Sequence, residues 1–181
     1  MAKLILLDRD GVINHDSPEF IKSPEEWHAI PGSLEAIAQL RQHGIPVAVC
    51  SNQSGVARGL ISTAMLNAIE DKMRSQLRGF GVELDMVLYC THHPDDGCAC
   101  RKPEPGMLLT AMSDLNTAAT DTCFVGDSLR DLQASRRAGC EPVLVETGYG
   151  RETANQLDEA DSTRVYPDLA AFSLAELAED S

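Results

Sequence analysis

Two carboxylates near the start of the chain lie close enough in sequence to act together, for example in binding a metal ion. Leu4–Leu7 is an apolar run, and Asp8-Arg9-Asp10-Gly11 follows it directly. Such a run predicts a short strand buried on both faces, with the acids at its carboxyl end. Ligands of parallel sheets bind at that end, and two neighbouring carboxylates there repel each other unless a cation lies between them. Because oxygen ligands suit hard divalent ions, we expect Mg²⁺ at this position.

Later segments carry residues that could complete such a site. Two further apolar runs end at Ser51 and at Asp127, and a basic pair stands at Arg101 and Lys102. An Asp-x-Asp-Gly motif by itself is also a common turn, because Asp and Gly both favour turns. The other runs favour a shared site, since the carboxyl ends of parallel strands meet at one edge of a sheet.

A second group of reactive side chains lies near the middle of the chain. Three thiols and two imidazoles fall within 11 residues, around a proline and a glycine. Tetrahedral sets of sulfur and nitrogen donors are what Zn²⁺ prefers. We expect Cys90, His92, Cys98 and Cys100 to bind Zn²⁺ as a closed structural site, with His93 outside it. The alternative interpretation is a redox or disulfide pair.

The composition limits the partners that the chain can bind. Its 181 residues include 28 acidic and 15 basic side chains, a formal charge of −13. This charge disfavours nucleic acid and anionic membranes as partners. A phosphorylated substrate remains compatible, because Arg9, Arg58, Arg101 and Lys102 fall beside predicted strand ends. No apolar run is long enough for a membrane span or a signal peptide, which predicts a cytoplasmic protein with reduced cysteines.

The surrounding sequence predicts alternating strands and helices, with Ser33 and Ser62 as caps of the first two helices. Strands are expected at 4–7, 47–51, 86–89, 123–127, 141–145 and 164–166, and helices at 34–43, 62–79, 106–115, 129–138 and 169–177, with a turn at 148–150. Segment 14–31 exceeds the usual length of a plain loop, which favours a lid or substrate contact over an inert excursion. The whole predicts one α/β domain over 1–181: a Rossmann-like three-layer sandwich with a mostly parallel central sheet.

Together these motifs resemble the haloacid dehalogenase (HAD) superfamily of phosphatases with an aspartate nucleophile. The resemblance covers Leu4 to about Gly148 and rests on residues 8–11, 51–59, 90–103 and 126–127. Because the chain has no room for a cap domain, it is similar to the capless branch with a zinc-binding loop. That branch contains the D-glycero-D-manno-heptose 1,7-bisphosphate 7-phosphatases and the histidinol-phosphate phosphatases.

The resemblance implies a role for each residue of the site. Asp8 would be the nucleophile that forms an aspartyl-phosphate, with Mg²⁺ between Asp8, the backbone carbonyl of Asp10 and Asp127. Asp10 would protonate the leaving alcohol and then activate water, a role that requires a raised pKa. Ser51 and Lys102 would hold the oxygens of the transferring phosphoryl group.

Substrate contacts are expected around the same edge. Arg101 would face away from Lys102 and bind a second phosphate, which favours a bisphosphate. The other candidates for substrate binding are Asp16, Asn52, Gln53 and Ser54. By resemblance the substrate is a heptose bisphosphate on the way to the lipopolysaccharide core, with histidinol phosphate as the alternative.

Two other classes of protein share part of this pattern. A receiver-like switch is also phosphorylated on aspartate, but Asp10 argues against it because a switch needs a longer-lived acyl phosphate. A zinc-bearing interaction module would leave Asp8, Ser51 and Asp127 unexplained. We expect a monomer, since no apolar stripe is left after the core is assigned.

Two positions leave more than one role open. Asp131, one turn into its helix, could stabilise the helix amino end or form an ion pair with Lys102. Ser128 and the segment 16–20 depart from the pattern of the capless branch, where a lysine and a glycine- and tyrosine-bearing stretch are common. We expect these departures to affect substrate contacts and not the phosphatase chemistry.

Overall fold

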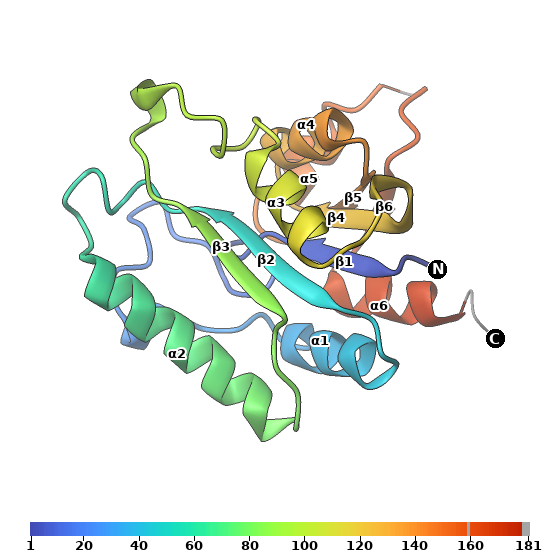
Figure 1. Ribbon diagram of the computed structural model, residues 1–181, viewed down its shortest axis with the longest axis horizontal. Coiled ribbons are helices and arrows are strands. Elements are labelled where there is room, and N and C mark those ends of the chain that lie inside the picture. Colours follow the sequence, from blue (N-terminus) through green and yellow to red (C-terminus); the bar gives the residue numbers. More distant parts are fainter. Residues whose placement is uncertain (159, 179–181) are drawn as a thin grey trace.

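The computed structural model describes residues 1–158 and 160–178, which form three layers around a parallel sheet (Figure 1). In the described part of the chain the sheet has six strands in the order β3-β2-β1-β4-β5-β6. They are β1 (Leu4–Leu7), β2 (Val47–Asn52), β3 (Met86–Cys90), β4 (Thr122–Gly126), β5 (Glu141–Val145) and β6 (Arg164–Tyr166). Every paired register is parallel. The strand that carries Asp8 therefore lies inside the sheet, between β2 and β4.

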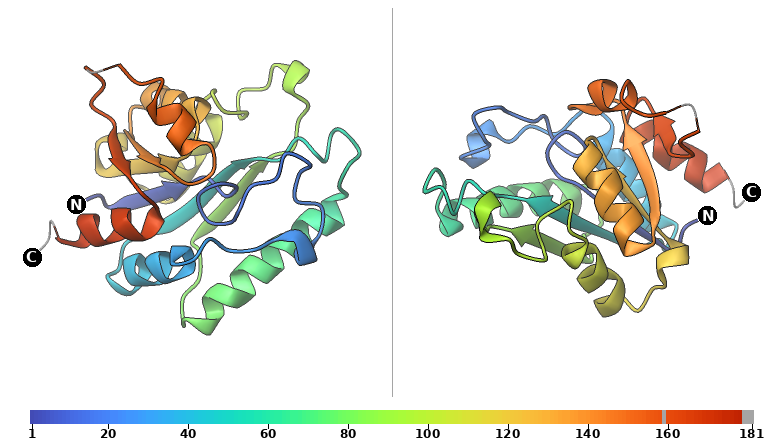
Figure 2. Two further views of the ribbon diagram at one scale, coloured as in Figure 1. Left: turned by 180° about the vertical axis from the view of Figure 1, so that it is seen from behind. Right: turned by 90° about the horizontal axis from the view of Figure 1, so that it is seen from above.

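Helices cover both faces of the sheet (Figures 1 and 2). On one face lie α1 (Ser33–Gln42), α2 (Thr63–Gly79) and α6 (Leu169–Ala178), and on the other α3 (Gly106–Asp114) and α4 (Leu129–Ala138). This arrangement confirms the predicted fold class. The short helix α5 (Gly150–Ala154) follows β5, and the sequence predicts only a turn there.

The residues of β1 supply both layers of the core. Ile5 and Leu7 pack into the core beneath α1, α2 and α6, whereas Leu4 and Leu6 pack into the smaller core beneath α3 and α4. All four side chains are fully buried. Burial of such a side chain contributes about 1.5–3 kcal/mol, so β1 holds the residue that follows it firmly.

One helix cap differs from the prediction. Ser62 caps α2 as expected, since its Oγ accepts a hydrogen bond from Met65 N at 3.1 Å. The prediction for Ser33 is wrong: Gly32, with φ +85°, caps α1, and Ser33 is the first residue of the helix. The Ser33 hydroxyl instead donates to the carbonyl oxygen of Ile13 at 2.6 Å, which ties α1 to the segment after β1.

Segment 14–31 is fixed against α2. It contains the 3₁₀ turn η1 (Pro24–Glu26), which lies beside α2 (Figure 2), and the fully buried side chain of Trp27. Lys72 Nζ of α2 donates to the carbonyl oxygens of Pro24 and Trp27 at 2.6 and 2.7 Å. Residues 24–27 of this segment are therefore anchored to α2, while residues 16–21 lie near the sheet edge.

Within residues 1–158 and 160–178 no segment forms a separate cap domain. The long connections at 14–31 and 91–105 contain no regular element beyond one 3₁₀ turn each. In the same described residues, no helix combines the length and the apolar character that a membrane crossing requires.

Candidate active site

The carboxyl ends of three neighbouring strands meet at one edge of the sheet. Asp8 follows β1, Ser51 lies at the end of β2, and Asp127 follows β4. These residues line a common pocket. Its other lining residues are Asp10, Asp16, Ser17, Pro18, Phe20, Ile21, Asn52, Gln53, Ser54, Arg58, Arg101, Arg130 and Tyr149.

Three carboxylates crowd together at this edge. One oxygen of each of Asp8, Asp127 and Asp131 lies within 4.8 Å of the other two, and all three residues are buried. Burial raises the pKa of Asp8 to about 6 and that of Asp127 to about 8, and repulsion from Asp131 contributes to both shifts. A divalent cation would remove this repulsion, so the donor set fits Mg²⁺.

Lys102 supplies a buried positive charge next to the nucleophile position. Its Nζ lies 3.0 Å from Asp8 Oδ1 and 2.7 Å from Asp131 Oδ1. Burial alone would lower the pKa of Lys102, but the carboxylates of Asp131 and Asp8 outweigh burial and raise it. The ammonium group therefore stays charged behind Asp8, in reach of a phosphoryl group bound there.

The side chain of Asn52 fixes the backbone of Lys102. Asn52 Nδ2 donates to Lys102 O at 3.0 Å, and Asn52 Oδ1 accepts from Lys102 N at 3.1 Å. Asn52 was predicted as a substrate contact, and it does line the pocket. The structure gives it a second task, because it joins the end of β2 to the loop that carries Lys102.

Asp131 has both of the roles that the sequence leaves open. Its Oδ1 contacts Lys102, whereas its Oδ2 accepts from Ser128 Oγ at 2.6 Å and from Ser128 N at 3.0 Å. It therefore caps the amino end of α4 and orients Lys102. Gly126 makes room for it, since a Cβ at this glycine would lie 2.2 Å from the Asp131 Cβ.

Tyr149 and Thr153 hold Asp127 in place. Tyr149 N donates to Asp127 Oδ2 at 2.9 Å, and Thr153 Oγ1 of α5 donates to Asp127 O at 2.9 Å. Gly11 and Gly148 flank the carboxylate, and a Cβ on either would lie 2.0 Å from Asp127 Oδ2. The helix that sequence patterns did not predict thus helps to orient an acid of the cluster.

The carboxylate of Asp10 has a different environment. It accepts hydrogen bonds from Arg9 Nε at 3.0 Å, Asn14 Nδ2 at 2.9 Å and Gln53 Nε2 at 2.8 Å. The same Gln53 nitrogen donates to Ser51 Oγ at 3.1 Å. Burial alone would raise the pKa of Asp10, but the positive charge of Arg9 and the hydrogen bonds from Arg9, Asn14 and Gln53 lower it. This direction is opposite to the raised pKa that its expected role requires.

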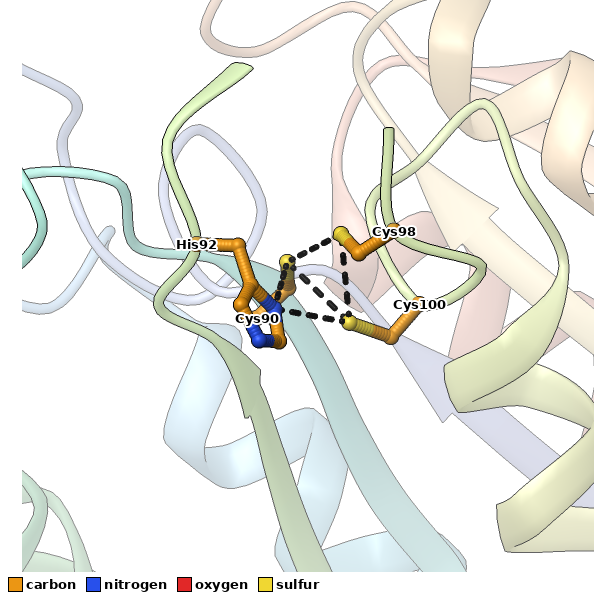
Figure 3. Close-up of side chains that lie close together, drawn as sticks. All are labelled: Cys90, His92, Cys98 and Cys100. Atoms are coloured by element: carbon orange, nitrogen blue, oxygen red, sulfur yellow. Dashed lines mark hydrogen bonds between the residues drawn. The ribbon is translucent and has the colours of Figure 1, made fainter. Parts of the chain in front are cut away.

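Four side chains of the 90–100 segment converge on one point (Figure 3). The Sγ atoms of Cys90, Cys98 and Cys100 lie 3.3–3.6 Å apart, and His92 Nδ1 lies 3.2 Å from Cys100 Sγ. Sulfur ligands about 2.3 Å from a tetrahedral zinc ion lie about 3.8 Å from each other, so the cluster has nearly the size that Zn²⁺ needs. His93 stays outside the cluster, where its side chain caps a 3₁₀ turn.

Comparisons with known proteins agree with this geometry. A family described as haloacid dehalogenase-like hydrolase matches residues 5–85, and one described as HAD-hydrolase-like matches residues 99–172. A D-glycero-beta-D-manno-heptose-1,7-bisphosphate 7-phosphatase of Bordetella bronchiseptica is 54% identical, over 94% of this chain and 96% of its own. The chain belongs to this phosphatase family. Its predicted membership of the HAD superfamily is thereby confirmed.

Other members of the family support the same assignment. The corresponding enzyme of Pseudomonas aeruginosa is 47% identical over 95% of this chain and 96% of its own. A crystal structure of D,D-heptose 1,7-bisphosphate phosphatase from B. bronchiseptica, complexed with magnesium and phosphate, matches with a TM-score of 0.94 at 54% identity, over 98% and 99% of the two chains. One from Burkholderia thailandensis matches with 0.77 at 40% identity, over 97% and 99%.

The structure brings most of the predicted residues together at the pocket. They are Asp8, Asp10, Asp16, Ser51, Asn52, Gln53, Ser54, Arg101 and Asp127. Lys102 lies behind Asp8 and reaches it directly. Arg9 is different: the expectation that it adds positive charge beside the substrate is wrong, because its side chain is fully buried and bound to Asp10.

Two pocket residues were not found from the sequence. Arg130 lies in the first turn of α4, and its Nε donates to Ser128 Oγ at 3.3 Å. A signal for Arg130 exists, because helix amino ends at the carboxyl edge of a parallel sheet commonly face ligands. Tyr149 gives no such signal, since its place depends on the unpredicted helix α5.

Proposed function

We propose that the chain is a Mg²⁺-dependent phosphatase that removes the 7-phosphate of D-glycero-D-manno-heptose 1,7-bisphosphate, in the supply of heptose for lipopolysaccharide. The observation that carries this proposal is the buried acid cluster of Asp8, Asp127 and Asp131 with the Lys102 ammonium 3.0 Å from Asp8. The relatives that cover nearly the whole chain are named for this reaction, which favours it over histidinol-phosphate hydrolysis.

The first step is transfer of the phosphoryl group to Asp8. A Mg²⁺ ion held by Asp8, the Asp10 carbonyl and Asp127 would supply charge neutralisation at the phosphate. A carboxylate oxygen of Asp8 forms a bond to phosphorus while the bond from phosphorus to the sugar oxygen breaks. Lys102 and the hydroxyl of Ser51 stabilise the charge on the phosphoryl oxygens.

Asp10 moves the protons of both half-reactions. It donates a proton to the leaving sugar oxygen, and it then accepts one from the water that hydrolyses the aspartyl-phosphate. This restores the Asp8 carboxylate and releases inorganic phosphate. Because an anion nearby raises the pKa of a carboxyl group, an approaching phosphate counteracts the depression that Arg9 causes at Asp10.

Arg101 is suited to the second phosphate. It lines the pocket beside Asn52 and Asp16, whereas the adjacent Lys102 lies behind Asp8. Its Nη1 is buried and has no hydrogen-bond partner among the described residues. Gln53 and Ser54 add polar groups to the same wall for the sugar hydroxyls.

The cysteine cluster is proposed to hold one structural Zn²⁺. With four protein ligands, Cys90, His92, Cys98 and Cys100, it leaves no open position for catalysis. Cys100 directly precedes Arg101, so the ion would fix the backbone from which Arg101 and Lys102 extend. We further propose one domain over 1–181, acting as a cytoplasmic monomer.

The test is steady-state phosphate release with Mg²⁺ from the heptose bisphosphate, histidinol phosphate and fructose 1,6-bisphosphate. We expect kcat/KM for the heptose to exceed the others by about 100-fold, since discrimination by paired charged groups reaches this size. Arg101→Ala should lower the value for the heptose bisphosphate by about 10–100-fold, because a hydrogen bond to a charged group is worth about 1.5–3 kcal/mol.

Arg78→Ala is the matched control, because Arg78 is an exposed residue of α2 that pairs only weakly with Glu83 at 3.9 Å. It should leave all three values unchanged. Better turnover of histidinol phosphate would assign the protein to that substrate. Absence of turnover with every ester would restore the receiver-like interpretation.

A further inference from the structure

Arg9 stands between the two catalytic acids in sequence but takes no part in the pocket. Its side chain is 0% exposed. Its Nε lies 3.0 Å from Asp10 Oδ1 and its Nη2 lies 3.1 Å from Asp10 Oδ2, so the guanidinium binds both oxygens of one carboxylate. Burial of a guanidinium is costly unless a carboxylate meets it in good geometry. The protein therefore maintains a buried cation directed at Asp10.

The other contacts of Asp10 do not replace this one. Asn14 Nδ2 donates to Oδ1 alone and Gln53 Nε2 to Oδ2 alone. A single hydrogen bond to one oxygen leaves the carboxylate free to tilt about it, whereas a bidentate guanidinium fixes the carboxylate plane. Among the described contacts, only those of Arg9 engage both oxygens from one group.

Arg9 also lies against an aromatic ring. Its Cζ lies 5.7 Å from the centroid of the Tyr89 ring, a distance at which a cation is attracted to an aromatic face. Tyr89 belongs to β3 and directly precedes Cys90, the first residue of the cysteine cluster. The position of Arg9, and through it that of Asp10, is therefore set by the strand that leads into the cluster.

We propose that Arg9 is a positioning residue that holds the Asp10 carboxylate in the orientation for proton transfer. The inference rests on the proposed function, because it takes Asp10 as the acid and base of a phosphatase. Lysine cannot fully replace Arg9, since an ammonium group is a point charge and does not match the two oxygens of a carboxylate. Arg9 contacts the acid cluster only through its backbone N–H, which donates to Asp8 Oδ1 at 2.7 Å, and its side chain does not line the pocket. A change of the side chain should therefore impair proton transfer and spare phosphoryl transfer.

The two half-reactions allow this distinction to be measured. A sugar or other alkyl phosphate releases an alkoxide, which needs a proton from Asp10 as the bond to phosphorus breaks. 4-Nitrophenyl phosphate releases 4-nitrophenolate as a stable anion without a proton, while the same bond forms between Asp8 and phosphorus. Hydrolysis of the aspartyl-phosphate needs Asp10 as base in both cases. Misplacement of Asp10 should therefore slow both half-reactions of the alkyl ester and the hydrolysis of the aspartyl-phosphate. It should spare only the formation of the aspartyl-phosphate from the aryl ester.

The experiment uses Arg9→Met in the Mg²⁺-loaded enzyme, with stopped-flow detection of 4-nitrophenolate. We expect a burst of one 4-nitrophenolate per active chain at a rate within about threefold of wild type, followed by turnover that is slower by about 100-fold. With glycerol phosphate as the alkyl probe, kcat should fall by about 100-fold and KM should change by less than about threefold.

Two further variants keep the inference falsifiable. Arg9→Lys retains a buried cation, so it should fold where Arg9→Met does not, and it should recover part of the alkyl turnover. Adding Arg9→Met to Asp10→Asn should cause no further loss, because residues that act through one another are not additive. The inference is overturned if the burst and the alkyl turnover fall equally, or if neither changes. Failure of the wild-type enzyme to release phosphate from the heptose bisphosphate itself would instead reject the proposed function.

Discussion

The sheet edge and the 90–100 segment both gather metal-binding side chains, but they do so by opposite routes. Asp8 is far in sequence from Asp127 and Asp131, and the three acids meet because β1 and β4 end side by side. The four residues of the cysteine cluster lie within 11 positions of each other, and three of them are partly exposed. The fold thus creates the first site, whereas the second is formed within one short segment of the chain.

This difference assigns chemistry to the first site and support to the second. At the sheet edge, buried strands and backbone donors fix each acid independently of any metal. The cysteine cluster has no comparable scaffold, but the sequence Cys100-Arg101-Lys102 joins it directly to the two side chains proposed to bind phosphate. Damage to the first site should abolish the reaction, while damage to the second should weaken it.

The largest effect is expected from Asp8→Asn. The variant has no nucleophile, so phosphate release should fall by about 10⁴-fold or more. Steady-state phosphate release measures the loss, and circular dichroism verifies the fold. Asp121→Asn, at an acid that pairs only with Lys3 on the surface among the described residues, is the control and should remain fully active. Activity of Asp8→Asn above about one hundredth of wild type would remove Asp8 as nucleophile.

A smaller effect should follow from loss of the cysteine cluster. His92→Ala should lose its Zn²⁺, while activity falls by about 10–100-fold because Arg101 and Lys102 lose their support. Elemental analysis should give one zinc per wild-type chain and much less in the variant. His93→Ala alters the adjacent imidazole outside the cluster and should retain both metal and activity. Equal loss in the two variants would break the assignment of the ligands.

The smallest effect concerns the pH dependence of stability in metal-free protein. With its pKa raised to about 8, folded Asp127 keeps a proton that the unfolded chain releases near pH 4. The folded state therefore binds more protons, and stability falls as the pH rises from about 4 to 8.

Asp127→Asn removes this titration and should melt about 2–4 °C above wild type at pH 8 without metal. At pH 5 the difference should nearly vanish. Addition of Mg²⁺ should stabilise wild type more at pH 8 than at pH 5, because binding requires ionised carboxylates. Calorimetry measures the melting temperature of both proteins at each pH. If the two melting temperatures change with pH in the same way, the raised pKa of Asp127 is contradicted.

Much of the site could be predicted because its residues are tied to strand ends. The unbroken apolar run of β1 fixes where the strand ends, and parallel order places Asp8, Ser51 and Asp127 at one edge. The cysteine cluster could be predicted for another reason, since its ligands are close in sequence and no long-range contact is needed to find them.

Sequence patterns did not predict features that depend on contacts between distant parts of the chain, such as the direction in which a side chain points. Arg9 follows a strand end, but its side chain is fully buried, where it binds Asp10 and lies over the Tyr89 ring. Helix α5 is short and follows a glycine-rich turn, so it has no apolar period long enough to recognise. The cap of α1 differs from the prediction because Gly32 takes the cap position, and the Ser33 hydroxyl donates to the Ile13 carbonyl oxygen, which only the folded chain brings near.

Gly11 and Gly148, which flank the Asp127 carboxylate, also limit which substitutions this sequence can accept. Any side chain at Gly11 or Gly148 collides with the carboxylate oxygen, and the two sites come from distant parts of the chain, so a change at one cannot compensate for the other. Tyr149 is under no such constraint, because it serves Asp127 through its backbone N–H alone. The turn that holds the Asp127 carboxylate is thus also a place where the pocket can acquire a new side chain, and with it a new substrate, at little risk to the reaction.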